Sequence, residues 1–314
     1  MKWTFSLVVP LILVLTVSSF RHPKQKITTK EALGEKLFHD KILSEDFTIS
    51  CSSCHIPAFA FADTVALSVG VHGKMGVRNT PSAMNMAARE IFFYDGRAKT
   101  LEEQVVFPIE NPVEMNLPFS EAVQRVRNNK TYQQLFLKIF GKMPDSTSIA
   151  ESIAAFERTL ETADTPNDRW LQDKPNGMNE QQIRGRELFM SRRLKCFDCH
   201  FSPDLTGDEF RNIGLFNGKE WNDSGRAVIT KNPKDIGKFK VPGLRNIAVT
   251  APYMHNGRFK TLREVIDFYD NPEKFVQGAI NRDAILPLQL NLTEQEKQDL
   301  ESFFHSLTDD RFLK

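Results

Sequence analysis

Two short stretches, Cys51-Ser52-Ser53-Cys54-His55 and Cys196-Phe197-Asp198-Cys199-His200, decide how this sequence folds. Both follow the pattern Cys-x-x-Cys-His, and together they contain all 4 cysteines of the 314-residue chain. Two thiols at this spacing can each add to one vinyl group of a haem, and the adjacent histidine can then bind the iron. We therefore expect two covalent c-type haems, attached through Cys51 and Cys54 and through Cys196 and Cys199, with His55 and His200 as axial iron ligands.

The first 20 residues have the pattern of a signal peptide. Lys2 provides the charged start, and an apolar stretch over 7–17 is followed by small residues. A membrane anchor is the alternative, but the apolar stretch is shorter than the roughly 20 residues that span a bilayer, and Pro10 interrupts it. We therefore expect a periplasmic protein from which residues 1–20 have been cleaved.

The charged residues nearly cancel, with 41 Lys and Arg against 40 Asp and Glu, so electrostatics gives no support for a nucleic acid partner. The composition, 40% hydrophobic and 26% charged, is sufficient for two modest globular domains. A segment rich in Pro, Asn and Asp, 166–177, is expected to connect them. The first domain then covers 27–165 and the second covers 178–314.

Apolar periodicity predicts a mainly α fold with long loops and few strands. Helices that begin at capping residues are expected over 120–140, 148–162, 179–190, 261–269 and 293–307. The segments that precede the two haem motifs are similar, with Gly34-Glu35-Lys36-Leu37-Phe38 before the first and Gly185-Arg186-Glu187-Leu188-Phe189 before the second. This similarity indicates an internal duplication of a small helical unit.

From Leu37 onward the sequence resembles the bacterial dihaem cytochrome c peroxidase family, which includes the methylamine dehydrogenase maturation enzyme. Besides the two haem motifs, the resemblance is carried by Leu37-Phe38, Leu43-Ser44, Phe61-Ala62-Asp63, Arg78-Asn79-Thr80-Pro81-Ser82, Asp95-Gly96-Arg97, Leu101-Glu102-Glu103-Gln104, Asn111-Pro112-Val113-Glu114-Met115, Leu244-Arg245-Asn246 and Ala251-Pro252-Tyr253-Met254-His255-Asn256-Gly257. It covers nearly all of the mature chain. The resemblance implies two cytochrome c-like haem domains with an active site near their interface.

The resemblance also implies distinct roles for the two haems. The N-terminal haem would bind hydrogen peroxide, and the C-terminal haem would pass electrons to it from a small cytochrome c or cupredoxin. His55 would be the proximal ligand of the peroxide-binding haem, and Glu114 the distal acid/base that moves a proton between the peroxide oxygens. Gln104 would offer hydrogen bonds to bound peroxide. Without the family pattern, Glu114 would read as a surface carboxylate beside a proline turn.

Family members hold a calcium ion between the haem domains. The corresponding positions here are Asn79 and the carbonyl oxygens of Thr250 and Pro252, with waters completing the shell. Oxygen ligands of this kind suit Ca²⁺. The alternative is that Asn79 only caps the turn before Pro81.

The sequence departs from the family pattern at two aromatic positions. Where the well-known peroxidases have a Trp between the haems, this chain has Tyr94, which could relay electrons or simply pack between the domains. The distal ligand of the C-terminal haem, Met in typical peroxidases and Tyr in the maturation enzyme, falls on Tyr269, with Met254 as the fallback. Tyr269 could instead be a core residue of its helix. A tyrosine oxygen would lower the haem potential and a methionine sulfur would raise it.

Three functions remain open at this point. The first is a peroxidase that reduces hydrogen peroxide to water. The second is an oxidase that resembles the maturation enzyme and acts on a partner protein or an organic molecule. The third is a dihaem electron carrier, which would need a sixth ligand such as His72 on the N-terminal haem, although a solvated loop histidine is the simpler interpretation. Family members are commonly homodimers, and nothing in the composition decides this.

Overall fold

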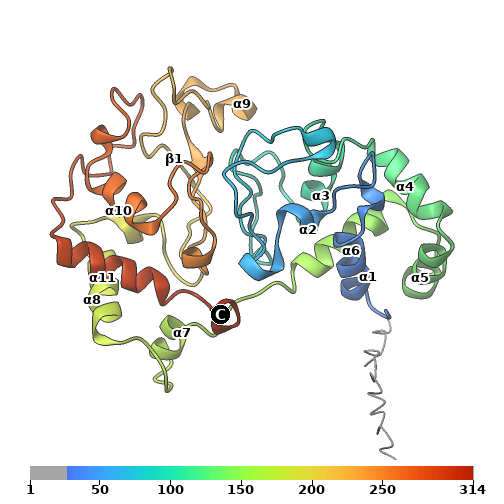
Figure 1. Ribbon diagram of the computed structural model, residues 1–314, viewed down its shortest axis with the longest axis horizontal. Helices are drawn as coiled ribbons and strands as arrows, with labels where there is room; N and C mark the ends of the chain where they lie inside the picture. Colours follow the sequence, from blue (N-terminus) through green and yellow to red (C-terminus); the bar gives the residue numbers. More distant parts are fainter. Residues whose placement is uncertain (1–26, 314) are drawn as a thin grey trace, which may run out of the picture.

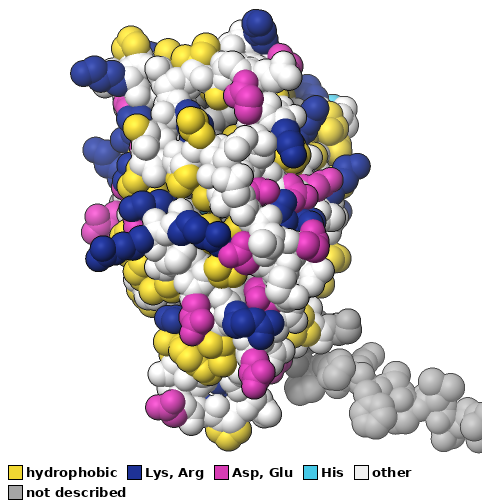
Figure 2. All heavy atoms as spheres, turned by 90° about the vertical axis from the view of Figure 1, so that its left-hand side faces the viewer, with side chains coloured by type: hydrophobic (Ala, Val, Ile, Leu, Met, Phe, Trp, Pro, Cys, Tyr) yellow, Lys and Arg dark blue, Asp and Glu magenta, His cyan; other side chains and the backbone are white. Residues whose placement is uncertain are grey.

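The computed structural model describes residues 27–313, which form two lobes that lie side by side (Figure 1). The predicted signal peptide, 1–20, lies outside the described residues. Among the described residues, no helix combines the length and the apolar character needed to cross a bilayer. On the face of the second lobe that Figure 2 draws, basic and acidic side chains are interspersed, as the balanced composition leads one to expect.

The fold is mostly helical with little sheet, as predicted. The first lobe contains α1 (Lys30–Phe38), α2 (Cys51–Cys54), α3 (Leu101–Glu110), α4 (Phe119–Asn128), α5 (Lys130–Phe140) and α6 (Ser146–Glu157). The chain then continues through α7 (Pro166–Leu171), α8 (Glu180–Phe189), α9 (Ala227–Thr230), α10 (Leu262–Asp270) and α11 (Glu294–His305). The strands β1 (Phe210–Arg211) and β2 (Phe239–Lys240) form one short antiparallel pair. Long loops connect these elements.

Two of the predicted helices have the wrong bounds. The helix expected over 148–162 is α6, which ends at Glu157. The expected helix over 120–140 is two helices, because Asn129 leaves the helical conformation at φ −85° and ψ 116°. Its side-chain oxygen accepts hydrogen bonds from the amides of Thr131 and Tyr132 and so starts α5 as a capping residue. The expected connection over 166–177 also contains α7, whose first turn is closed by a capping box between Thr165 and Asp168.

Each lobe is built around one closely packed pair of helices. In the first lobe α1 crosses α6 at Gly34, where an added Cβ would lie 1.8 Å from the Ser152 carbonyl oxygen and 2.9 Å from Phe156 Cβ. Only glycine allows this approach. The contact brings the apolar faces of the two helices together in a core that also contains Leu37 and Ile153.

The second lobe repeats this arrangement. Here α8 meets α11 at Gly185, where an added Cβ would lie 1.9 Å from the Asp299 carbonyl oxygen and 2.8 Å from Phe303 Cβ. The aromatic rings also correspond, because the Phe189 and Phe303 centroids are 5.2 Å apart and those of Phe38 and Phe156 in the first lobe are 5.1 Å apart. The duplication inferred from the sequence is therefore present in the packing of both lobes.

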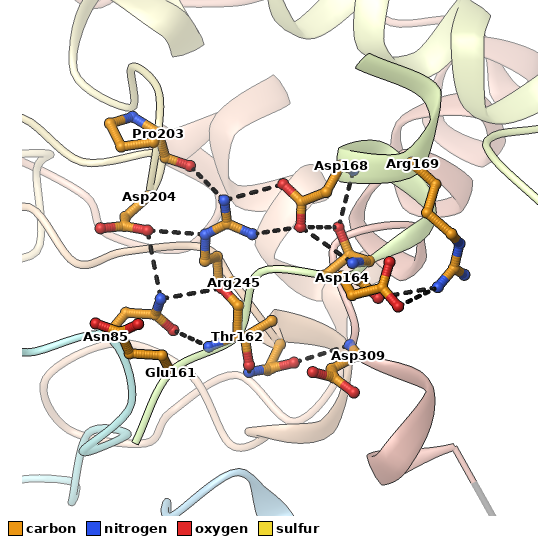
Figure 3. Close-up of polar contacts among 12 residues, drawn as sticks. Asn85, Glu161, Thr162, Asp164, Asp168, Arg169, Pro203, Asp204, Arg245 and Asp309 are labelled. Atoms are coloured by element: carbon orange, nitrogen blue, oxygen red, sulfur yellow. Dashed lines mark hydrogen bonds and ion pairs between the residues drawn. The ribbon is translucent and has the colours of Figure 1, made fainter. Parts of the chain in front are cut away.

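Polar contacts around Arg245 hold the lobes and the connecting segment together (Figure 3). Arg245 makes two hydrogen bonds of 2.8 and 3.0 Å to the carboxylate of Asp168 in α7, and its Nε donates to Asp204 Oδ1 at 2.8 Å. From the first lobe, Arg89 forms an ion pair with Asp204, and Asn85 Nδ2 lies 3.5 Å from Asp204 Oδ1. Because these groups are mostly buried, each charge depends on its partners.

Candidate haem sites

The first Cys-x-x-Cys-His motif forms the short helix α2. A capping box between Ser50 and Ser53 starts the turn, so Cys51 and Cys54 lie three residues apart on one side of it. Both cysteines are free and half-buried. Burial raises the pKa of Cys51 well above its usual range and that of Cys54 to about 11, so neither is a reactive thiolate.

The His55 ring is held in a fixed orientation. Its Nδ1 lies 2.9 Å from the Phe61 carbonyl oxygen, and the ring of Phe38 packs 6.2 Å away. Burial lowers the pKa of His55, while the carbonyls of Phe61 and Pro81 act in the opposite direction, so the imidazole is neutral near pH 7. Within residues 27–313 no hydrogen bond reaches Nε2, so that nitrogen is free to bind a metal.

The second motif has the same features. His200 Nδ1 lies 2.9 Å from the Leu205 carbonyl oxygen, and the ring of Phe189 packs 6.4 Å away. Burial raises the pKa of Cys196 to about 12 and that of Cys199 to about 11. Two unpaired thiols, a neutral histidine with one free nitrogen and apolar walls are the groups that a c-type haem requires. The residues of both motifs therefore fit such a haem.

Glu114 lies in the loop after α3 and is oriented by its neighbours. Asn111 Nδ2 donates to Glu114 Oε1 at 2.6 Å, and the Val71 amide donates to the Glu114 carbonyl at 2.8 Å. Burial raises the pKa of Glu114, while the Asn111 hydrogen bond and the charge of Arg97 lower it. The Glu114 charge also makes a small contribution to the raised pKa of both Cys51 and Cys54.

The sequence analysis did not single out two residues that position Glu114. Asn111 holds one carboxylate oxygen, and its place at the start of the Asn-Pro-Val-Glu-Met stretch was the available signal. Gly70 packs against the Glu114 backbone, where an added Cβ would lie 2.3 Å from the Val113 carbonyl oxygen and 2.5 Å from that of Glu114. A larger residue at position 70 would displace this loop.

Gln104 lies on α3 and is half-buried. Gln104 and Pro108, at positions i and i+4, share one face of α3. Asn111, which bonds to Glu114, ends this helix in an extended conformation, and no hydrogen bond among the described residues joins Gln104 to Glu114.

Tyr94 lies where the two lobes meet. Its carbonyl oxygen accepts a hydrogen bond of 2.7 Å from the Lys240 amide of the second lobe. It also lines a small cavity of about 110 Å³ together with residues of both lobes, among them Met84, Lys240 and Arg245. Burial raises the pKa of Tyr94 well above its usual range. In the described part of the chain, the phenol forms no hydrogen bond, and the one charged group that acts on its pKa is Arg78, which cannot take its proton.

The two predicted alternatives for the distal ligand of the second haem share one core and differ in a second contact. Both pack against the core that contains Tyr253, and Tyr269, on α10, also packs against the core that Cys196 contacts. Burial raises its pKa well above the usual range, and the Cys196 and Cys199 thiols add to this rise. Met254 is half-buried with a φ of 69° and packs in the neighbouring core beside Tyr253.

The three predicted calcium ligands come from two loops that contact each other. The Asn79 amide donates to the His255 carbonyl oxygen at 2.8 Å, and Asn79 Nδ2 donates to the carbonyl of Val65 at 3.1 Å. Among the residues that the structure describes, no hydrogen bond ends on Asn79 Oδ1 or on the carbonyl oxygens of Thr250 and Pro252. No group of three or more His, Cys, Asp or Glu that could hold a metal occurs in that part of the chain.

His72 is an exposed loop residue. Its Nε2 lies 2.9 Å from Glu45 Oε2, and its Nδ1 lies 3.8 Å from Asp46 Oδ2. The residue also has a positive φ of 57° within a tight turn. This environment agrees with the interpretation of His72 as a solvated loop histidine.

Comparison with known proteins agrees with this picture. Residues 28–176 match the family model described as di-haem cytochrome c peroxidase. The cytochrome c peroxidase Ccp of Escherichia coli is 36% identical over 90% of this chain, which spans only 59% of that longer protein. The methylamine utilization protein MauG of Methylophilus methylotrophus is 34% identical, over 88% of this chain and 82% of its own length.

A solved structure is also similar along almost the whole chain. The crystal structure of a MauG-like protein associated with microbial copper homeostasis is 33% identical, with a TM-score of 0.82 and 91% of each chain covered. Its similarity extends over both lobes, whereas the family model covers mainly the first. This chain therefore belongs to the di-haem cytochrome c peroxidase family, whose members include MauG-like proteins.

Proposed function

We propose that this protein is a periplasmic dihaem peroxidase that reduces hydrogen peroxide to water with electrons from a small cytochrome c or cupredoxin. Residues 27–165 form the N-terminal peroxidatic haem domain, and 178–314 form the C-terminal electron-transfer haem domain. The observation that carries the proposal is the half-buried carboxylate of Glu114, which Asn111 holds by a hydrogen bond in a loop that packs closely on Gly70.

When bound to Cys51, Cys54 and His55, a haem supplies the redox-active iron at which peroxide is reduced. Asn111 occupies Oε1 of Glu114, which leaves Oε2 to accept the proton of one peroxide oxygen and return it to the other as that oxygen leaves as water. Burial raises the pKa of Glu114, which favours this two-way transfer near neutral pH. Two electrons and two protons convert one peroxide into two waters.

The C-terminal domain would receive the electrons. Its haem would be held by Cys196, Cys199 and His200, and we propose Tyr269 as a further iron ligand because its ring packs against the same core as Cys196. Met254 is the fallback. We also propose that Tyr94, at the lobe boundary, lies on the electron route between the haems as an aromatic ring through which electrons tunnel while its phenol keeps its proton.

The calcium site is a further part of the proposal. Asn79 Oδ1 and the carbonyl oxygens of Thr250 and Pro252 are the protein ligands, supported by their lack of hydrogen-bond partners among the described residues. A chelator such as EGTA should lower peroxidase activity in the wild-type protein, and added Ca²⁺ should restore it. Activity that EGTA leaves unchanged would refute the site.

A second candidate is a MauG-like oxidase that acts on a partner protein or an organic substrate. The position of Tyr269 beside the second motif favours it, because an oxygen ligand stabilises oxidised iron. Tyr94, in place of the tryptophan that the resemblance implies, points against it. The electron carrier is supported least, because His72 bonds to Glu45 at the surface.

One experiment separates these candidates. Electron paramagnetic resonance of the ferric and half-reduced protein should show a high-spin N-terminal haem, and peroxide should be consumed rapidly in the presence of a reduced donor protein. Glu114→Gln should abolish this consumption, whereas Glu90→Gln, a change at an exposed carboxylate of the same lobe, should leave it intact. Two low-spin haems that are inert to peroxide in every redox state would leave the electron carrier. Oxidation of an organic substrate without turnover of the donor would favour the oxidase.

A further inference from the structure

The second lobe holds three consecutive residues of the first lobe, Tyr94, Asp95 and Gly96. The Lys240 amide donates to the Tyr94 carbonyl oxygen at 2.7 Å. Arg226 Nη1 donates to the Asp95 carbonyl oxygen at 3.2 Å. The backbone on both sides of the Asp95 side chain is therefore fixed by the other lobe.

Gly96 lies directly against the same part of the second lobe. An added Cβ at this position would lie 2.4 Å from Arg226 Nη1 and 2.4 Å from Phe210 Cζ. The φ of Gly96 is 72°, which favours glycine as well. Arg226 and Phe210 also contact each other, with Arg226 Cζ 3.7 Å from the ring centroid, and Phe210 pairs with Lys240 across β1 and β2. A larger residue at position 96 would push the segment away from this surface.

The Asp95 side chain ties the segment to the second lobe through a charged link. It is 4% exposed, and its Oδ2 accepts from Arg78 at 2.6 Å and from Arg97 at 2.7 Å. Arg78 also makes two hydrogen bonds, of 2.7 and 2.8 Å, to the Asp223 carboxylate of the second lobe. Because these side chains are largely buried, the loss of one partner leaves a charge that water cannot stabilise well.

The cavity that Tyr94 lines reaches the loop that orients His55. Its wall on the side of the first lobe includes Met84. The preceding residue, Ala83, donates its amide to the Phe61 carbonyl oxygen at 3.1 Å. That same oxygen lies 2.9 Å from His55 Nδ1, so one backbone contact separates the cavity wall from the first proximal histidine.

On its other side the cavity reaches the loop that orients His200. Its wall there includes Pro242. The carbonyl oxygen of the preceding residue, Val241, accepts from Thr206 Oγ1 at 2.6 Å. The carbonyl oxygen of Leu205, the neighbour of that threonine, lies 2.9 Å from His200 Nδ1. The cavity and the tyrosine that lines it therefore lie between the loops that hold the two proximal histidines.

We propose that Arg226 and Asp223 are positioning residues, which hold the segment 94–96 so that the Tyr94 ring stays between the haem sites and electrons cross rapidly. This inference rests on the proposed function, in which the donor protein reduces the C-terminal haem and Tyr94 lies on the route. Each transfer oxidises the C-terminal haem by one electron and reduces the N-terminal haem by one, and the phenol keeps its proton. A misplacement of about 1 Å in a reacting arrangement can cost about 100-fold in rate.

The test is the rate of this electron transfer in the purified holoprotein with Ca²⁺ in excess. The half-reduced protein is mixed with saturating hydrogen peroxide in a stopped-flow instrument, and oxidation of the C-terminal haem is followed by its absorbance. Gly96→Ala, which pushes the segment away, and Arg226→Met combined with Asp223→Asn, which release it, should each slow the transfer by about tenfold or more. Both haem potentials should stay unchanged. Arg186→Met is the control, because this arginine of α8 packs over the Trp170 ring and not at this contact.

Two further measurements separate positioning from a general loss of structure. Hydrogen exchange at the Lys240 amide, which donates to the Tyr94 carbonyl oxygen, should be faster in Gly96→Ala and in the double variant than in the control. In a Tyr94→Leu background, Gly96→Ala should slow the transfer no further, because both changes act through the same ring.

Several results would overturn the inference. Transfer at the wild-type rate in both Gly96→Ala and the double variant would show that the contact does not position the ring. An equal slowing by Gly96→Ala with and without the Tyr94 ring, or a slowing that follows a changed haem potential, would also refute it. A C-terminal haem that peroxide leaves reduced in the wild-type protein would instead overturn the proposed function, and this inference with it.

Discussion

Replacing Gly34 by alanine tests the helix contact on which the first lobe depends. The new Cβ would lie 1.8 Å from the Ser152 carbonyl oxygen, whereas such atoms settle roughly 3.5 Å apart, so α1 and α6 would have to separate by about 1.7 Å. Overpacking of this kind costs about 3 kcal/mol when the obstacle is backbone that cannot rotate away. Alanine regains about 1 kcal/mol through its higher helix propensity. We therefore expect a net loss of about 2 kcal/mol in the free energy of unfolding.

Urea unfolding, followed by far-ultraviolet circular dichroism and by the haem absorbance, measures this change. Gly76→Ala is the matched control, because its Cβ would lie no closer than 3.4 Å to any neighbour and its φ is not positive. The control should unfold within about 1 kcal/mol of the wild-type protein. Gly185→Ala should destabilise as Gly34→Ala does, since its Cβ would lie 1.9 Å from the Asp299 carbonyl oxygen. A Gly34→Ala protein as stable as the control would refute the close contact.

Three further predictions concern the site and the lobe contact. Asn111→Ala removes a hydrogen bond that stabilises the charged form of Glu114, so the pKa of Glu114 should rise. The acidic limb of the pH profile of kcat/KM for peroxide should then move to higher pH. An acidic limb that stays in place would contradict the role of Asn111. Tyr269→Met should raise the potential of the C-terminal haem, read by redox titration, and an unchanged potential would mean that Tyr269 is not a ligand. Arg245→Met leaves the largely buried Asp168 and Asp204 without this partner and should lower the free energy of unfolding by about 3 kcal/mol. A loss below about 1 kcal/mol would show that the contact is dispensable.

The parts of the fold that sequence predicts well are those decided by local chemistry. The two haem motifs are such a case, because His55 follows Cys54 directly and needs only one carbonyl, that of Phe61, to fix its ring. The helices α8, α10 and α11 were also located, since a capping residue and a periodic apolar face lie within each short segment. The expected helix over 120–140 failed at Asn129, a residue that can continue a helix or start a new one.

The parts that sequence predicts poorly depend on contacts between distant segments. Gly70 is an unremarkable glycine until the loop that carries Glu114 lies against it, 44 residues further along the chain. Glu157 follows a buried phenylalanine and precedes an arginine, a context that fits a surface position equally well. Its burial follows from the way α6 packs on α1, which no periodicity within α6 reveals.

The duplication explains how one scaffold can support two different haem environments. The glycine contacts and the paired phenylalanines are the same in both lobes, because they form the helix pairs that each motif needs. The differences lie where packing leaves a choice. Glu157 follows Phe156 on α6, whereas Phe304 follows Phe303 at the corresponding place on α11, and Glu114 lies in a loop of the first lobe, whereas Tyr269 lies on α10 of the second. A carboxylate can exchange protons and a phenylalanine ring cannot. The proposed division between a peroxide-reducing haem and an electron-transferring haem therefore depends on these differences and not on the helices that the two lobes share.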